Sequence, residues 1–234
     1  MTESLQGLIA ETRYVFFDFD GPICRLFAGH SAEDIAIAQV KWLKDRGLFG
    51  LLTDRERTHP DPHGVLSAVA RRHPDSDLVA ELEERLTQKE LEAVPTAWPT
   101  EFADPLIRTW VAVGARLAIV TNNSARTVTS YLESRGLLEC FAPYIYGRSK
   151  NLELLKPHPH TLNRALNVLG AAPDSTLMIG DAPSDCEAAR SAGVSFLGYG
   201  RDPAVAKELL KAGAAPGHIV GSLKPVLQIV RGRA

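Results

Sequence analysis

The sequence lacks the features that mark a membrane protein or a cysteine-based site. It has only three cysteines, Cys24, Cys140 and Cys186, which lie far apart, and no C-x-x-C pair indicates a metal knuckle or a redox dithiol. No apolar run approaches the roughly 20 residues needed to cross a bilayer, and the N-terminus lacks a basic start followed by an apolar stretch. We therefore expect buried or free thiols in a cytoplasmic protein with no membrane partner.

The sequence also lacks an excess of basic charge. Its formal net charge is -2 and its pI is near 6.4, which provides no positive field for the phosphates of a nucleic acid. No G-x-x-x-x-G-K-[ST] loop is present, and Gly198-Tyr199-Gly200 lacks the third glycine of a dinucleotide fingerprint. These absences argue against a nucleic-acid partner and give no support to nucleotide binding by these routes.

What the chain has is the composition of a globular protein, with 45% hydrophobic and 23% charged residues over a length that allows one large domain or a core plus an insert. Four short apolar runs end abruptly in polar residues or glycine, as expected for buried strands that deliver side chains to an exit loop. These runs are Tyr14–Phe17, Leu117–Val120, Leu177–Ile179 and Ser195–Leu197.

Helical patterns alternate with these runs. They cover Ser124–Arg135, Pro157–Leu169 and Ser184–Ala192, and a glycine directly follows each of them. Alternating strands and helices predict an α/β fold, a Rossmann-like doubly wound parallel sheet with helices on both faces. In such a sheet, ligands bind at the carboxyl ends of the strands.

The stretch from Pro22 to about Pro99 interrupts this alternation, because it shows amphipathic helices and no convincing strand. The helices are predicted over Ala32–Arg46, Gly64–Arg72 and Asp77–Ala93, and the proline-containing clusters at 59–62 and 95–99 indicate turns or a hinge. We therefore expect an α/β core domain made of residues 1–21 plus 99–234 and an inserted helical domain over residues 22–98.

Asp18 and Asp20 lie two residues apart at the end of the first predicted strand, so both side chains can face one cavity beyond the sheet. Gly21 allows the backbone to turn sharply there. One carboxylate can attack an electrophile while the other transfers protons, provided that the pKa of Asp20 rises from about 3.9 towards neutrality. Taken alone, an acidic pair at a strand end is also an ordinary loop or metal-binding feature.

Further candidates follow the other strands. Thr121 and Asn122 can donate to phosphate oxygens, although Thr-Asn-Asn-Ser is also a good helix cap. Lys156 can pair with phosphate and with Asp18, and the acids Asp181 and Asp185 suit a hard cation that prefers oxygen ligands. Individually, each of these residues has an ordinary structural interpretation as a cap or a surface group.

Together, the four segments resemble the motifs of the haloacid dehalogenase-like hydrolase superfamily. They match in order as Asp18-Phe19-Asp20-Gly21, Thr121, Lys156-Pro157, and Gly180-Asp181 through Asp185. The resemblance covers nearly the whole chain, and its closest type is the phosphoglycolate-phosphatase-like branch. The helical insert over 22–98 resembles the smaller type of cap in this superfamily, which closes over the site and selects substrates.

The resemblance implies a role for each matched residue. Asp18 corresponds to the phosphoryl acceptor and a ligand of Mg²⁺, and Asp20 to the acid/base that also offers a backbone carbonyl to the metal. Thr121 and Lys156, with Asn122 beside them, would hold the phosphate. The remaining two acids complete the site, with Asp181 as a direct metal ligand and Asp185 as its supporting ligand, often through water.

The expected activity is therefore Mg²⁺-dependent hydrolysis of a small phosphorylated metabolite through an aspartyl-phosphate intermediate. A phosphomutase of the β-phosphoglucomutase type shares every motif and remains an alternative, and a non-catalytic phosphate-binding or signalling protein is a further one. The expected partner is the phosphorylated small molecule alone, bound by a monomer or homodimer.

Several other side chains have two interpretations. Arg25 and His30 can meet an anionic or hydroxylated substrate near the mouth of the site, or can belong to the surface or hinge. His158 and His160 form an H-x-H pair that can bind a transition metal, although solvated residues at a helix start explain it as well. The three tryptophans are expected in cores or at the hinge; they are Trp42, Trp98 and Trp110.

Overall fold

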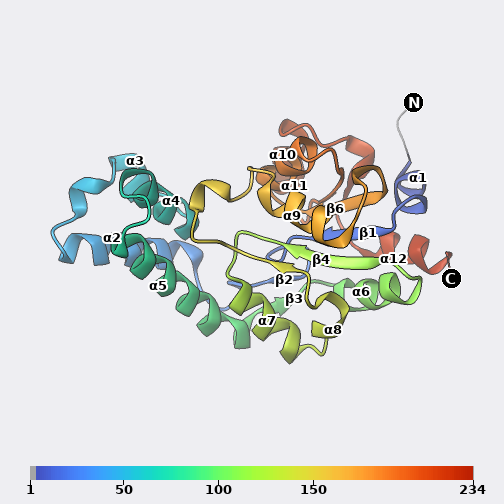
Figure 1. Cartoon of the computed structure of the whole chain (residues 1–234), viewed down its shortest axis with the longest axis horizontal. Coiled ribbons are helices and arrows are strands. Elements are labelled where there is room, and N and C mark those ends of the chain that lie inside the picture. Colours follow the sequence, from blue (N-terminus) through green and yellow to red (C-terminus); the bar gives the residue numbers. More distant parts are fainter. Residues whose placement is uncertain (1–3, 234) are drawn as a thin grey trace.

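The computed structural model describes residues 4–233 and arranges them as a sheet-containing part and a helical part (Figure 1). Six parallel strands form the main sheet in the order β5-β4-β1-β6-β7-β8, which places β1 in the interior. These strands are β1 (Tyr14–Phe17), β4 (Arg116–Val120), β5 (Ile145–Tyr146), β6 (Thr176–Gly180), β7 (Ser195–Tyr199) and β8 (Ile219–Val220).

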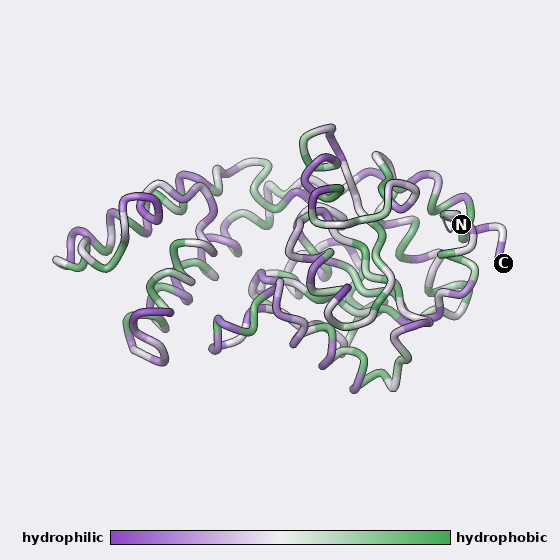
Figure 2. Tube along the Cα trace, turned by 90° about the horizontal axis from the view of Figure 1, so that it is seen from above, coloured by the Kyte–Doolittle hydropathy of each residue, from purple (hydrophilic) through white to green (hydrophobic). Residues whose placement is uncertain are grey.

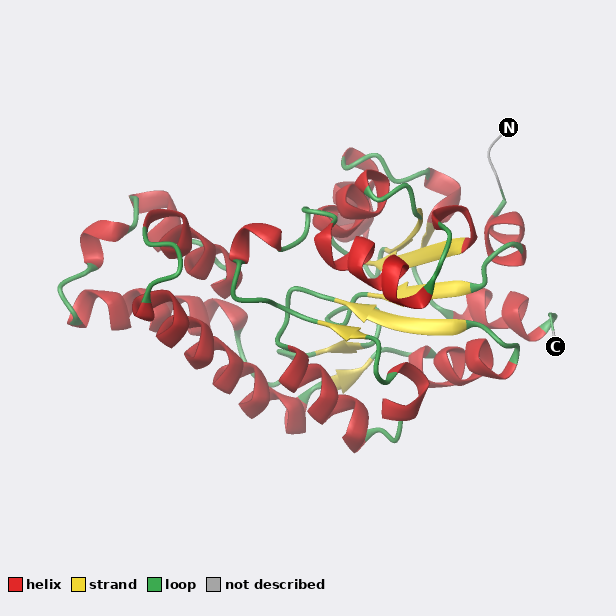
Figure 3. Cartoon of the chain, viewed as in Figure 1, coloured by secondary structure: helices red, strands yellow, loops and turns green. Residues whose placement is uncertain are grey.

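Alternate side chains of the central strands point to opposite faces of the sheet. On β1, Val15 and Phe17 join one hydrophobic cluster, whereas Phe16 joins another together with Met178 of β6. Both clusters are covered by helices, as Figure 3 shows, and hydrophobic segments run through the middle of this part in Figure 2. This arrangement confirms the predicted doubly wound α/β fold and explains the uninterrupted apolar runs of the strands.

The helices of the sheet-containing part follow the predicted alternation. They are α1 (Leu5–Ala10), α6 (Ala103–Ala112), α7 (Ala125–Ser134), α8 (Leu138–Phe141), α9 (His160–Leu169), α10 (Pro183–Ser191), α11 (Pro203–Lys211) and α12 (Lys224–Arg231). The prediction that a helix begins at Pro157 is wrong, because α9 begins at His160. Pro159 disfavours the helical conformation for the residue before it, so the helix cannot include His158.

The helical part consists of four helices at one end of the molecule (Figure 1). They are α2 (Ala32–Asp45), α3 (Asp54–Arg57), α4 (Pro62–Arg72) and α5 (Asp77–Ala93). Their buried side chains form a separate hydrophobic cluster that includes Trp42, Leu66 and Leu82. The same cluster contains Leu152 and Leu155, which come from the loop that follows β5. We call α2–α5 the cap.

Two short strands lie where the chain enters and leaves the cap. β2 (Cys24–Arg25) pairs antiparallel with β3 (Trp98–Pro99). The expectation of no strand between Pro22 and Pro99 is therefore wrong at its two ends, since a two-residue strand is too short to show an alternating pattern. Trp98 is 60% exposed and lies at this hinge, whereas Trp42 and Trp110 are buried.

Within residues 4–233, none of the helices combines the length and the apolar character that crossing a bilayer requires.

Candidate active site

The carboxyl ends of β1, β4 and β6 open into one cavity of about 330 Å³. Its core side contains every residue that the four matched motifs name as a catalytic, phosphate-binding or metal-binding candidate, together with Asn122. Its cap side contains residues of α2, α4 and the segments before them. The core residues are Asp18, Asp20, Thr121, Asn122, Lys156, Asp181 and Asp185. The structure thus brings together side chains from four distant segments of the sequence.

Asp18 follows the last residue of β1 and is 8% exposed. Its Oδ1 accepts a hydrogen bond from the backbone N–H of Phe19 at 2.8 Å and pairs with Lys156 Nζ at 2.9 Å. Among the residues that the structure describes, Oδ2 accepts no hydrogen bond. The carboxylate is therefore held through Oδ1, which leaves Oδ2 without a hydrogen bond from the described residues.

Asp20 lies two residues further along, where its Oδ1 accepts a hydrogen bond from the backbone N–H of Leu26 at 2.9 Å. Burial raises the pKa of Asp20 to about 6. The hydrogen bond from Leu26 lowers this pKa, and the negative charge of Asp18 raises it further. The carboxyl can therefore carry a proton close to neutral pH, as an acid/base needs to.

Lys156 is 5% exposed, and three oxygens surround its ammonium group. Besides the Asp18 carboxylate, these are Asp185 Oδ1 at 2.5 Å and the carbonyl oxygen of Val120 at 2.9 Å. Burial alone would lower the pKa of Lys156, but the charges of Asp18 and Asp185 outweigh it and raise the pKa. The lysine is thus a fixed cation at the floor of the cavity.

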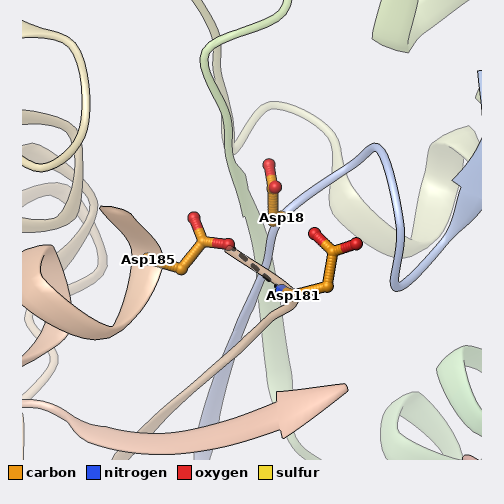
Figure 4. Close-up of side chains that lie close together, drawn as sticks. All are labelled: Asp18, Asp181 and Asp185. Atoms are coloured by element: carbon orange, nitrogen blue, oxygen red, sulfur yellow. Dashed lines mark hydrogen bonds between the residues drawn. The ribbon is translucent and has the colours of Figure 1, made fainter. Parts of the chain in front are cut away.

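Three carboxylates meet beside Lys156. Asp18, Asp181 and Asp185 each place an oxygen within 4.8 Å of the others. Figure 4 shows Asp18 approaching from the end of β1 and the other two from the stretch that leads from β6 into the first turn of α10. Asp185 Oδ2 also accepts hydrogen bonds from the backbone N–H groups of Asp181 and Ala182, at 3.2 and 3.1 Å. This bonding fixes Asp185 at the start of α10, and its supporting role at a metal stays a prediction.

A divalent cation fits this group of side chains. Carboxylate oxygens are the ligands that hard cations prefer, and the negative charge here exceeds what Lys156 and the Arg201 guanidinium, 3.4 Å from Asp181, can balance. Burial and the charges of Asp18 and Asp185 raise the pKa of Asp181 well above its usual range. A bound cation would relieve that repulsion. The Asp20 side chain is not in the cluster, and its expected backbone contribution to metal binding stays a prediction.

Thr121 and Asn122 occupy the end of β4, but their side chains are used differently. The Thr121 hydroxyl is buried and bonds to Oδ1 of Asn123 at 3.1 Å. The Asn122 amide bonds twice to the backbone of Lys156, donating to its carbonyl oxygen at 3.1 Å and accepting from its N–H at 2.8 Å. Asn122 therefore fixes the loop that carries Lys156, while one N–H of its amide group donates to none of the described residues and the residue lines the cavity.

Gly21 completes the turn after Asp20 with a φ of 110°, a conformation that favours glycine. A Cβ at this position would meet the carboxylate of Asp181. The backbone of the first motif thus lies directly against the Asp181 carboxylate, an approach that a side chain at position 21 would obstruct.

Comparison with known proteins agrees with this arrangement. The family model described as haloacid dehalogenase-like hydrolase matches residues 77–199, which is more than half of the chain. The chain belongs to this family. Among solved structures, a hydrolase of the same family from Deinococcus radiodurans R1, crystallised with bound phosphate and sodium, superposes with a TM-score of 0.61 at 26% identity, covering 96% of this chain and 97% of that one.

Curated relatives place this haloacid dehalogenase-like hydrolase in the phosphoglycolate-phosphatase-like branch. A phosphoglycolate phosphatase of Colwellia psychrerythraea is 28% identical over 212 residues, covering 83% of this chain and 89% of the relative. The pyrophosphatase PpaX of Halalkalibacterium halodurans is 31% identical over 134 residues, covering 56% of this chain and 60% of the relative.

The sequence left two interpretations for Arg25 and His30 of this haloacid dehalogenase-like hydrolase, the mouth of the site or the surface and hinge. Neither residue lines the cavity. The guanidinium of Arg25 lies 5.5 Å from the centre of the Trp98 ring, so a cation–π contact at the hinge holds it. The cap residues that do line the cavity were not predicted; they are Phe27, Ala32, Pro60, Asp61 and His63.

One sequence signal could have pointed to His63 as a residue of the site, because it follows the cluster His59-Pro60-Asp61-Pro62 that marks a helix start. Asp61 caps α4 and places its Oδ1 3.1 Å from His63 Nδ1. Among residues 4–233, His158 and His160 are not part of a group of three or more metal-ligating side chains. His158 Nδ1 accepts a hydrogen bond from the backbone N–H of His160 at 3.2 Å, which is a local contact at the start of α9.

Proposed function

We propose that this hydrolase removes phosphate from a small phosphorylated metabolite in a Mg²⁺-dependent reaction that passes through an aspartyl-phosphate. The observation that carries the proposal is the arrangement at Asp18, whose carboxylate is fixed by Lys156 at 2.9 Å while the proton-carrying Asp20 lies two residues away in the same cavity. Nucleophile, acid and cation are the parts that phosphoryl transfer to a carboxylate requires.

In the first step, an oxygen of the Asp18 carboxylate attacks the phosphorus, and the bond from phosphorus to the leaving oxygen breaks. Asp20, whose pKa is raised to about 6, gives its proton to that oxygen, which leaves as the alcohol. Lys156 and Asn122 line the cavity, so the ammonium of Lys156 and the backbone N–H of Asn122 can balance the charge of the transferred group.

In the second step, Asp20 is ionised and accepts a proton from water, whose oxygen attacks the phosphorus. The bond between phosphorus and Asp18 breaks, which releases inorganic phosphate and regenerates both carboxyl groups in their starting states. The hydrogen bond from Leu26 keeps Asp20 in place through both steps. The same residue thus serves as acid and then as base.

Asp18, Asp181 and Asp185 would hold the Mg²⁺, with the backbone carbonyl of Asp20 as a further ligand. When bound, the ion would neutralise negative charge on the phosphoryl group and on the acids around it. The substrate is small, because the cavity measures about 330 Å³. Relatives named phosphoglycolate phosphatase and pyrophosphatase indicate which compounds to assay first, namely phosphoglycolate and inorganic pyrophosphate.

The test is turnover of a generic aryl phosphate with Mg²⁺ by the wild-type protein and by Asp18→Asn. We expect the variant to lose activity at least 1,000-fold, about what removal of an essential catalytic group costs, while it keeps its fold by circular dichroism. Retained turnover in Asp18→Asn would show that the nucleophile is wrongly assigned.

A phosphomutase would share this site, and the products separate the two activities. Incubation with phosphosugars should release inorganic phosphate, whereas an isomerised sugar phosphate without phosphate release would favour the mutase. The proposal of a small-molecule partner is supported by the size of the cavity, and a monomer or homodimer stays a prediction.

A further inference from the structure

A buried ion pair joins the cap to the core beside the active-site cavity. Glu90 of α5 is fully buried, and its Oε1 lies 2.7 Å from an Nη of Arg148, whose side chain is fully buried as well. Arg148 belongs to the loop after β5, outside the cap. Its other donors reach Thr87 Oγ1 at 2.9 Å and Glu83 Oε1 at 3.0 Å, both on α5. One core guanidinium thus bonds to three side chains of a single cap helix.

Glu90 also reaches the loop that carries Thr121. Its Oε2 accepts hydrogen bonds from the backbone N–H of Ser124 at 2.9 Å and from the Thr127 hydroxyl at 3.2 Å. Its Oε1 accepts one from the Asn123 amide at 3.3 Å, and that same amide group bonds to the Thr121 hydroxyl. The cap carboxylate therefore fixes the turn that positions the phosphate-binding residues after β4.

Arg148 fixes the same turn from the other side and leads towards Lys156. Its Nη1 donates to the carbonyl oxygen of Asn122 at 3.0 Å, and its backbone N–H donates to the carbonyl oxygen of Asn123 at 2.8 Å. The following loop, with Leu152 and Leu155, packs into the hydrophobic cluster of the cap before the chain reaches Lys156. The lysine is thus carried by a core loop that rests on the cap.

His63 connects this pair with the cavity. Its ring lines the cavity, and its Nε2 lies 3.0 Å from an Nη of Arg148 and 3.4 Å from Glu90 Oε1. A change of cap position that moves His63 would therefore also move Arg148 and Glu90. Because both charges are buried, separating them without new partners is costly, and the contact favours one seated position of the cap.

We propose that Arg148 and Glu90 are positioning residues, which align Thr121 and Lys156 for phosphate only when the cap is seated on the core. The inference rests on the proposed function, since it deepens the role of the same site. Neither residue lines the cavity, so they act through the two loops rather than on the substrate. The cap of this enzyme would then contribute to catalysis as well as to substrate selection.

The test compares two ion pairs that join the core to the same cap helix, α5. Arg126 of α7 pairs with Glu84 of α5 at 2.8 Å, but both side chains are about half exposed, so Arg126→Ala is the matched control for Arg148→Ala.

With the aryl phosphate, we expect Arg148→Ala to lower kcat about 100-fold, which is the size expected for a displacement of about 1 Å in the site. Arg148→Lys should recover part of this loss. We expect the inhibition constant of inorganic phosphate to rise about 10-fold in Arg148→Ala.

Hydrogen exchange provides a readout that does not depend on activity. In Glu90→Gln and Arg148→Lys, the amides of Ser124 and Arg148 should exchange faster, whereas those of β1 should not change, and Arg126→Ala should leave all of them unchanged. If wild-type protein turns over no phosphate ester, the proposed function fails while the exchange experiment still decides the positioning role. The positioning role would be overturned if folded Arg148→Lys kept the kcat, the phosphate inhibition constant and the exchange rates of the wild type. It would also be overturned if Arg126→Ala lost as much activity as Arg148→Ala. If Arg148→Ala does not fold, Arg148→Lys and Glu90→Gln carry the kinetic comparison.

Discussion

The two walls of the active-site cavity are built differently. On the core wall, Asp18, Thr121 and Lys156 are less than a tenth exposed, and each bonds to specific partners on neighbouring strands or loops. On the cap wall, Pro60 and Asp61 are exposed and Phe27 is half-buried. The core therefore offers a rigid site for a group that all substrates share, and we infer that the cap offers a more adjustable surface to the group that differs between them.

After Asp18→Asn, the largest effect should come from filling the space between the first motif and Asp181. In Gly21→Ala, the new Cβ would meet the Asp181 carboxylate, so we expect at least a 100-fold loss of kcat/KM. Gly47→Ala is the control, because Gly47 of the cap also has a positive φ, 73°, but faces open space. Kinetic measurements should show a loss for the first variant only, and similar losses in both would indicate that backbone strain alone is responsible.

Asp20→Asn should have the next largest effect, and one that depends on the substrate. Because its proposed task is to protonate the leaving oxygen, the loss should be about 100-fold or more for an alkyl phosphate and much smaller for an activated aryl phosphate. A plot of log kcat against the leaving-group pKa should therefore become steeper in the variant. Parallel plots would point to a positioning role instead.

His63 should make the stability of the cap depend on pH. Burial alone would lower the pKa of His63, but the carboxylates of Asp61 and Glu90 raise it to about 9, above the ordinary 6.5. The imidazolium therefore stabilises the fold fully below pH 6.5, and this contribution is lost as pH rises through about 9. His63→Gln should lower the free energy of unfolding by about 2–3 kcal/mol at pH 6 and by much less at pH 9.5.

Denaturant titrations of both proteins at the two pH values measure this difference. Glu90, whose pKa is lowered to about 2 by His63 and Arg148 despite its burial, stays ionised over the whole range and does not contribute to the change. A difference between wild type and His63→Gln that is the same at pH 6 and pH 9.5 would mean that His63 is uncharged in the folded protein.

The smallest effect is expected at the exposed part of the cap wall. Asp61→Asn keeps a capping side chain for α4 but removes a charge at the cavity, so KM for an anionic substrate should fall about two- to fivefold with little change in kcat. Steady-state kinetics should be measured with phosphoglycolate, whose leaving group is anionic, and with an aryl phosphate whose leaving group is uncharged. An equal change in kcat for both would place Asp61 in the chemistry rather than in selection.

The sequence predicted the core wall because its residues stand at fixed places relative to strong local patterns. A buried strand over Tyr14–Phe17 leads directly into Asp18 and Asp20, and parallel strands must bring Thr121 and Asp181 to the same edge. The two-residue strands β5 and β8 were missed, since such short segments show no periodicity.

The cap wall could not be predicted in the same way. Which side chains face the cavity depends on how the helices pack. The sequence left Arg25 either at the mouth of the site or at the surface or hinge, and Trp98, 73 positions away, holds it at the hinge. The pair of Glu90 and Arg148 leaves no local signal either, because 58 positions separate the two residues and neither belongs to a motif. Only the three-dimensional arrangement shows that they meet.

The packing of Leu152 and Leu155 within the cap cluster has a consequence for making chimeric enzymes. Exchanging residues 22–98 for the corresponding segment of a relative would leave two leucines of the host facing a foreign surface, and it would separate Arg148 from its acidic partner. A transplant designed to change substrate preference therefore needs two pieces, the inserted helices and the stretch from Arg148 to Leu155. Transferred together, these two pieces form a unit that recombination or protein engineering can exchange while the loop that carries Lys156 keeps its contacts with the cap.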